Sequence, residues 1–124
     1  MMAWLKGEPG KSVVEQLLID NPGDCYAHAF NLTEVYYLML RLRGMAGAEV
    51  AIQSLLDNGM TCREDLDTAF WKEAATFKGN HPMALPDAFC LALARRLGGT
   101  AVTTDHAEFD PLVPLNYAPI LFIR

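Results

Sequence analysis

Residues 83–105 constrain the fold more than any other part of the chain, because a helix, a helix stop and a strand succeed one another there. Pro86-Asp87 favours a helix start, since proline loses no hydrogen bond in a first turn and a carboxylate is stabilised by the positive end of the helix dipole. Apolar residues at helical spacing come next, and Gly98-Gly99 is typical of a left-handed helix exit. Residues 100–104 then predict a short strand that ends at Asp105.

The lengths of this helix and this strand predict that Asp87 and Asp105 are neighbours. A helix of about eleven residues is about 16 Å long, and a strand of about five residues covers about the same distance back. In an open parallel sheet the two acids would meet at the carboxyl edge of the strands, where α/β proteins place their sites. Two acids at that edge indicate a possible metal site.

The rest of the chain alternates strands with helices. Further strands are expected near residues 24–28, 60–62 and 119–123, and helices at residues 11–20, 31–43, 46–57 and 65–77. This alternation predicts a three-layer α/β/α sandwich with a mainly parallel sheet. At 124 residues the chain is most simply a single domain, residues 1–124. In the helix at 46–57, Val50 is expected to face inward.

Composition excludes several classes of protein. No apolar run is long enough to cross a bilayer and no secretory signal is visible, so we expect a cytoplasmic protein that does not enter a membrane. The formal net charge of -5 gives no general attraction to nucleic acid, so RNA contact must rest on a local patch or on metal ions. The three cysteines form no C-x-x-C pair, which argues against structural zinc and a disulfide framework.

A third acid is expected at the same edge. Asn31 and Glu34 form a capping-box pattern at the start of the helix after the strand near residues 24–28, so Glu34 should join Asp87 and Asp105. Clustered carboxylates repel one another, and a divalent cation removes that repulsion. Oxygen ligands favour Mg²⁺ or Mn²⁺ over zinc, and such a site can activate water against a phosphodiester.

Each acid also has a structural explanation. Glu34 can complete the capping box, Asp87 can stabilise its helix dipole and Asp105 can begin a turn. Their joint placement on one edge favours the functional interpretation. The three histidines are scattered, and none has a Ser or Cys partner at a recognisable spacing, so they are interpreted as turn or strand-end residues.

Residues 85–109 resemble the PIN-domain family, and most closely its toxins of the VapC type. The runs Pro-Asp-Ala-Phe-Cys-Leu-Ala-Leu-Ala-Arg-Arg-Leu-Gly and Val-Thr-Thr-Asp-His-Ala-Glu-Phe resemble the family's Asp-bearing helix, glycine exit and Thr-x-Asp strand end. The run Asn31-Leu-Thr-Glu-Val35 resembles its Glu-bearing helix start.

The resemblance implies a Mg²⁺- or Mn²⁺-dependent endoribonuclease that acts as the toxin of a toxin-antitoxin pair. It implies that Glu34, Asp87 and Asp105 are the catalytic, metal-binding acids and that Thr103 or Thr104 is a polar helper. It further implies a homodimer and an antitoxin protein as inhibitory partner.

One departure from the family pattern affects these expectations. The family begins with a central hydrophobic strand that ends in Asp, and residues 1–10 match only the family segment on the C-terminal side of that Asp. We therefore expect that the first central strand and the first acid are missing here and that the true start lies upstream. The alternative function is a catalytically impaired PIN-like module for protein or RNA binding. A phosphatase or receiver-like domain ranks last, because the acids at the end of a first strand are lacking.

Overall fold

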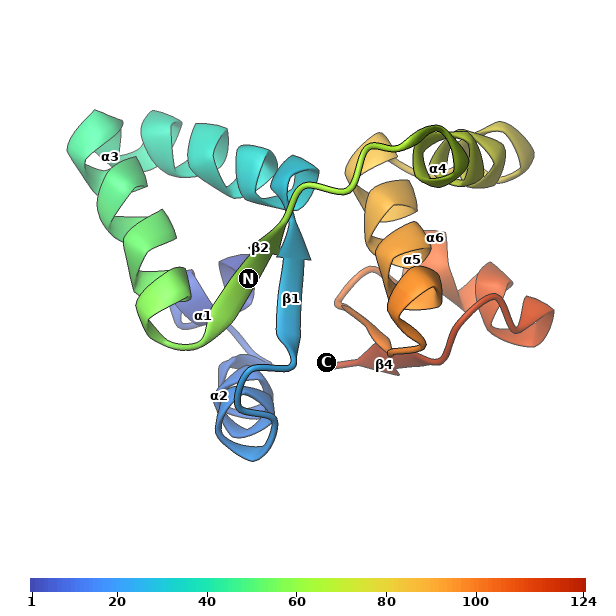
Figure 1. Cartoon of the computed structure of the whole chain (residues 1–124). Coiled ribbons are helices and arrows are strands. Elements are labelled where there is room, and N and C mark those ends of the chain that lie inside the picture. Colours follow the sequence, from blue (N-terminus) through green and yellow to red (C-terminus); the bar gives the residue numbers. More distant parts are fainter. The chain divides into compact units, whose positions relative to one another are not determined.

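The computed structural model describes every residue from Met1 to Arg124, and these divide into two compact units, Met1–Glu64 and Asp65–Arg124 (Figure 1). Each unit combines helices with a two-stranded parallel sheet, which confirms the predicted α/β class with parallel strands. The four strands lie where the sequence predicts them, and they form two pairs, β1–β2 in the first unit and β3–β4 in the second.

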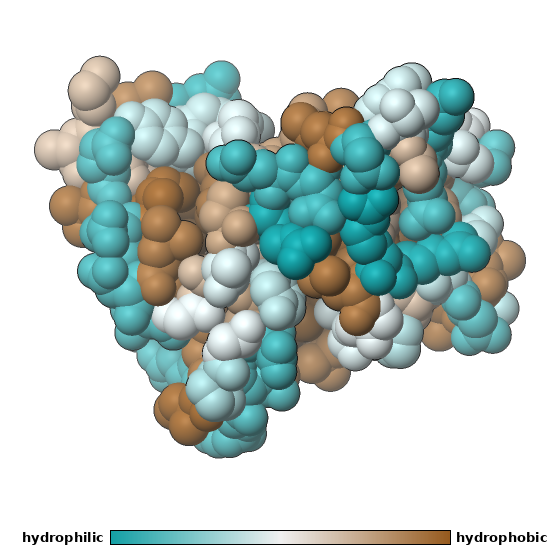
Figure 2. All heavy atoms as spheres, viewed as in Figure 1, coloured by the Kyte–Doolittle hydropathy of each residue, from teal (hydrophilic) through white to brown (hydrophobic).

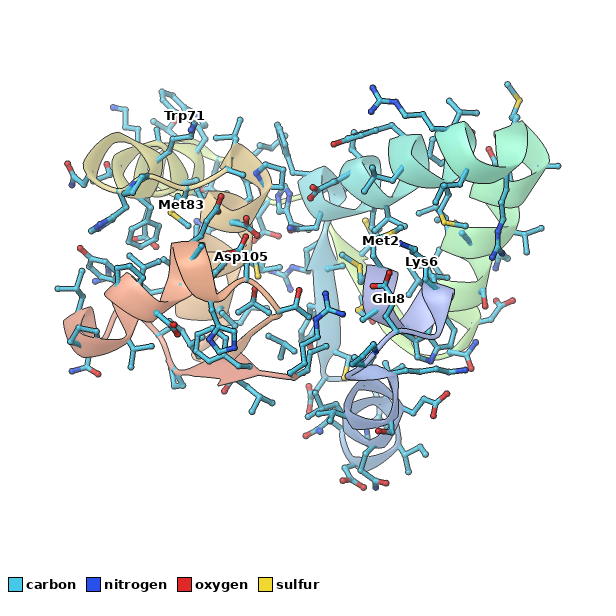
Figure 3. All side chains as sticks on the ribbon, turned by 180° about the vertical axis from the view of Figure 1, so that it is seen from behind. Met2, Lys6, Glu8, Trp71, Met83 and Asp105 are labelled. Atoms are coloured by element: carbon cyan, nitrogen blue, oxygen red, sulfur yellow. The ribbon has the colours of Figure 1, made fainter.

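The first unit is mainly helical. Its elements are α1 (Met2–Lys6), α2 (Lys11–Asp20), β1 (Cys25–His28), α3 (Ala29–Asp57) and β2 (Met60–Arg63). In the sheet, Tyr26 lies opposite Thr61 and His28 opposite Arg63. Lys6 ends α1 and forms an ion pair with Glu8 at 2.6 Å (Figure 3).

Helix α3 turns a corner at Gly44. The sequence predicts two helices here, and the structure joins them as two arms that meet at this residue (Figure 1). Gly44 has φ 74° and ψ -178°, a conformation that only glycine adopts without strain. The bend also brings the chain close to Gly47, where an added Cβ would clash with the Cβ of Arg43. The Tyr36 hydroxyl donates to Glu49 Oε1 at 2.9 Å and so links the two arms.

The predicted capping box at Asn31 and Glu34 is wrong. Helix α3 starts at Ala29, and its N-cap is His28, whose Nδ1 accepts a hydrogen bond from the Phe30 N–H at 3.1 Å. The imidazole caps the helix before Asn31 is reached, so Asn31 lies inside the first turn and Glu34 in the second.

The core of the first unit packs one face of α3 against β1. Its buried members are Ala27, Leu32, Val35, Met39, Ala48, Ala51 and Leu55, and the apolar side chains of α1 pack against them. The expectation that Val50 faces inward is wrong, because Ala48, Ala51 and Leu55 occupy the buried face and leave Val50 68% exposed. Apolar residues therefore reach the surface over α3 (Figure 2).

The second unit carries two longer helices and several short elements. They are α4 (Thr68–Asn80), α5 (Leu85–Leu97), β3 (Ala101–Thr103), α6 (His106–Phe109), the 3₁₀ helix η1 (Asp110–Leu115) and β4 (Ile120–Phe122). Helix α4 starts later than predicted because Asp67 caps it, accepting from the Phe70 N–H. Arg96 binds Asp67 at 2.7 Å and Asp65 at 3.0 Å, and so ties the end of α5 to this cap.

Helices α4 and α5 form the core of the second unit. Phe70 meets Phe89 edge to face at 5.7 Å between ring centroids, and Phe109 of α6 is fully buried. Trp71 of α4 is 43% exposed and points away from the helix into solvent (Figure 3). Neither unit contains a helix with the length and apolar character needed to span a membrane.

Candidate metal centre

Asp87 lies in the first turn of α5, as the sequence predicts. Pro86 occupies one of the first two helical positions, and Gly98 ends the helix in the left-handed conformation with φ 63°. Ala88 and Phe89 next to Asp87 are buried, so this end of α5 is anchored in the core. Asp87 itself is half-buried and sits near the positive end of the helix dipole, which stabilises a carboxylate.

Asp105 lies just after the end of β3 and caps α6 (Figure 3). Its Oδ1 accepts the Glu108 N–H at 2.9 Å, and its own N–H donates to Thr103 Oγ1 at 3.0 Å. These two bonds fix the side chain and the backbone of Asp105 at the carboxyl end of the strand. Thr103 is one of the two predicted helper residues and makes this contact; functional roles for Thr103 and Thr104 both stay predictions.

Glu108 is the third acid at this place, and the sequence pattern did not single it out. Its Oε2 accepts the backbone N–H of Ala84, the N-cap residue of α5, at 2.9 Å. Carboxylate oxygens of Asp87, Asp105 and Glu108 all lie within 4.8 Å of one another, and the three residues are half-buried. The spacing Asp105-x-x-Glu108 is itself a capping-box pattern, a signal that could have placed both acids at one helix start.

The cluster concentrates negative charge. Salt bridges in this unit join Arg96 to Asp65 and Asp67 and His106 to Asp110, but none involves Asp105 or Glu108. The backbone N–H groups engage one oxygen of each of these two carboxylates, which leaves the second oxygen for a further ligand. Carboxylates this close repel one another unless a cation or protons neutralise them.

The donor set fits a hard divalent cation. All three side chains offer carboxylate oxygen, which suits Mg²⁺ or Mn²⁺ better than zinc. Two oxygens bound to the same Mg²⁺ lie at most about 4.2 Å apart, given bond lengths of about 2.1 Å. Small side-chain rotations would bring oxygens now within 4.8 Å into that range.

Glu34, the other predicted member, belongs to the first unit. It is half-buried in the second turn of α3. Its approach to Asp87 and Asp105 stays a prediction.

The histidines have structural roles at turns and strand ends. His28 caps α3, and His81 meets the Tyr117 hydroxyl at 3.1 Å. His106 stacks on Phe122 at 4.1 Å between ring centroids, and its Nδ1 lies 3.0 Å from Asp110. The backbone carbonyl of Arg124 and the Asp110 carboxylate raise the pKa of His106.

The comparison with protein families matches most of the chain. The family model of the PIN domain covers residues 1–110, a range that contains Glu34, Asp87, Asp105 and Glu108. No curated protein and no solved structure matches the chain.

Proposed function

Because the chain belongs to the PIN-domain family, whose members are usually nucleases, we propose that it is a metal-dependent endoribonuclease that hydrolyses RNA phosphodiesters. The observation that carries the proposal is the meeting of three carboxylates, from Asp87, Asp105 and Glu108, at the starts of α5 and α6. PIN domains generally use Mg²⁺ or Mn²⁺, and this oxygen donor set suits either ion.

In this proposal Asp87, Asp105 and Glu108 hold the cation, and Glu34 contributes a fourth carboxylate from α3. When bound, Mg²⁺ or Mn²⁺ supplies an activated water and neutralises charge on the phosphodiester. Thr103 holds the backbone of Asp105, while the Ala84 N–H orients Glu108. Partners that fix a ligand's orientation in this way are part of a metal site's design.

We further propose that the protein is a VapC-type toxin that forms a homodimer, is inhibited by an antitoxin protein and acts in the cytoplasm. The support is the resemblance at residues 85–109 and 31–35. Induced expression should then arrest growth, and the Asp87→Asn variant should not. Co-expression of a small DNA-binding protein encoded next to the gene should relieve the arrest, and light scattering should give the mass of two chains.

The second candidate is a catalytically impaired PIN-like module that binds protein or RNA. It rests on the same family match, because membership of a fold family does not by itself require turnover. This alternative expects RNA or protein binding without turnover.

The deciding experiment incubates the purified chain with a mixed-sequence RNA in Mg²⁺, in Mn²⁺ and in EDTA. We expect cleavage only with metal, and a loss of about 100-fold or more in Asp87→Asn, because removing a ligand weakens metal binding at least as much as removing its supporting contacts. Asp57→Asn, at the end of α3, is the matched control and should retain the rate. Cleavage that survives both EDTA and Asp87→Asn contradicts the nuclease proposal, and metal binding without cleavage supports the module.

A further inference from the structure

A cavity of about 470 Å³ lies in the first unit, between α1 and the two arms of α3. We call it the corner groove, and the lining residues that matter here are Trp4, Leu5, Lys11, Met39, Arg43 and Val50. Residues from both sides of the Gly44 corner contribute, so the bend in α3 creates the groove. The groove is open to solvent along one side.

The groove combines an apolar lining with exposed apolar neighbours. Met39 is buried beneath it, while Val50 on its wall is 68% exposed. At the corner beside it, Leu42 is 61% exposed and Met45 is 68% exposed. Contiguous exposed apolar surface of this kind marks a place where another molecule binds.

The charged side chains of the groove are both cationic. Lys11 and Arg43 line it and no carboxylate does, although the whole chain carries a net charge of -5. Lys11 forms only an exposed ion pair, with 3.6 Å between its Nζ and Glu15 Oε1, and Arg43 forms no ion pair. The lining of the groove therefore carries positive charge, although the net charge of the whole chain is negative.

Trp4 adds an unused hydrogen-bond donor to the wall. Its indole Nε1–H is buried and has no acceptor in the structure. Buried donors in proteins are almost always paired, so this one is unusual. Because the Nε1–H is buried, it is closed to an incoming group, and the charges that the groove presents to a ligand are those of Lys11 and Arg43.

We propose that the corner groove binds an acidic amphipathic segment of a partner protein. An aliphatic side chain of that segment would cover Val50, and its carboxylates would face Lys11 and Arg43. RNA is the less suitable polyanion, because phosphate binding draws on many cations, whereas this groove offers two beside an apolar floor. The proposal concerns the first unit alone and does not depend on the nuclease assignment.

The chain contains its own reporter for this binding. Its two tryptophans are Trp4 and Trp71, and Trp71 is exposed on α4, so Trp71→Phe leaves Trp4 as the only indole. Trp4 emission would be titrated with an amphipathic peptide of about 20 residues, above the length of about 12–15 residues below which isolated helices are marginal, with Leu on one face and Glu on the other. We expect a saturable change, and at least about tenfold weaker binding of the same peptide with Lys in place of Glu.

Two variants and two matched controls test whether the peptide binds at the corner groove. In the Trp71→Phe background, Arg43→Glu and Val50→Asp should each weaken binding of the Glu peptide by about tenfold, because both place negative charge in the groove. Arg41→Glu on the same helix and Ile19→Asp on α2, where Ile19 is 71% exposed, lie outside the groove and should leave affinity unchanged.

Three results would overturn the proposal. The first is equal affinity of the protein for the Glu peptide and the Lys peptide. The second is an equal loss of affinity in the groove variants and the control variants. The third is displacement of the Glu peptide by polyuridine RNA, with the RNA itself changing Trp4 emission. Circular dichroism of each variant confirms that it is folded. Asp87→Asn should still bind the peptide, which separates failure of the groove from failure of the nuclease site.

Discussion

Two backbone N–H groups hold two of the three acidic residues of the candidate metal centre. The Glu108 N–H binds Asp105, and the Ala84 N–H binds Glu108, so these two carboxylates are oriented by main chain rather than by a flexible side chain. Main-chain donors supply no full positive charge, so the negative charges of Asp105 and Glu108 still favour a bound cation. Arg96 acts differently, because its guanidinium neutralises Asp65 and Asp67 directly.

The Asp67–Arg96 pair makes stability depend on pH. Hydrogen bonds from Arg96, reinforced by the Phe70 N–H and opposed by desolvation, lower the pKa of Asp67. A carboxyl whose folded-state pKa is depressed stabilises the fold above its unfolded pKa of about 3.9, and this contribution is lost as pH falls through the folded pKa. Asp67→Asn, which retains a capping side chain, should therefore be less stable than wild type near neutral pH, and the difference should shrink below about pH 4.

Urea unfolding from pH 7 to pH 2 measures this dependence. Asp20→Asn, an exposed change at the end of α2, serves as the control and should show no comparable trend. A stability difference between Asp67→Asn and wild type that stays constant across this pH range would show that the charge of Asp67 is irrelevant.

At the scale of elements, α5 and α3 show how far local signals determine a helix. Pro86, Asp87 and Gly98 act within one turn of the helix ends, so both ends of α5 can be predicted from the sequence. The start of α3 was decided by competition between two possible caps, and His28 took the position predicted for Asn31. Such competition depends on side-chain geometry that a pattern of residue types does not contain.

Two Gly→Ala changes, one beside the corner of α3 and one in α4, should have opposite effects on stability. At Gly79 in α4 no atom would meet a new Cβ, so Gly79→Ala should stabilise the protein by up to about 1 kcal/mol through helix propensity. At Gly47 the new Cβ would collide with that of Arg43, so Gly47→Ala should destabilise it by about 1–3 kcal/mol. Denaturant midpoints with unchanged m-values measure both effects, and stabilisation by Gly47→Ala would contradict the close approach at the corner.

At the scale of the whole molecule, the role of Glu34 as a metal ligand is a prediction that can be tested apart from the three clustered acids. Hydrogen exchange with and without Mg²⁺ tests it. We expect metal to slow exchange around residues 84–88 and 105–109, which surround the three clustered acids. If Glu34 is a ligand, residues 30–36 should be protected as well, and Glu34→Gln should lower Mg²⁺ affinity by about 10-fold or more.

Glu15→Gln on α2 is the matched control for this experiment and should leave Mg²⁺ affinity unchanged. Protection confined to residues 84–88 and 105–109, with unchanged affinity in Glu34→Gln, would remove Glu34 from the proposed site. Absence of any Mg²⁺-dependent protection would count against the metal centre as a whole.

The sequence by itself determined the α/β class, the four strand positions and the closeness of Asp87 and Asp105. These features arise from short-range rules, because helix caps, residue periodicity and the single turn between α5 and β3 act over a few residues. The local spacing Asp105-x-x-Glu108 can place Glu108 beside Asp105, but only the tertiary structure decided that Glu108 also reaches the start of α5, because there it accepts a hydrogen bond from the Ala84 N–H, 24 residues away. It also decided the corner at Gly44 and the exposure of Val50, because which face of a helix is buried depends on what packs against it.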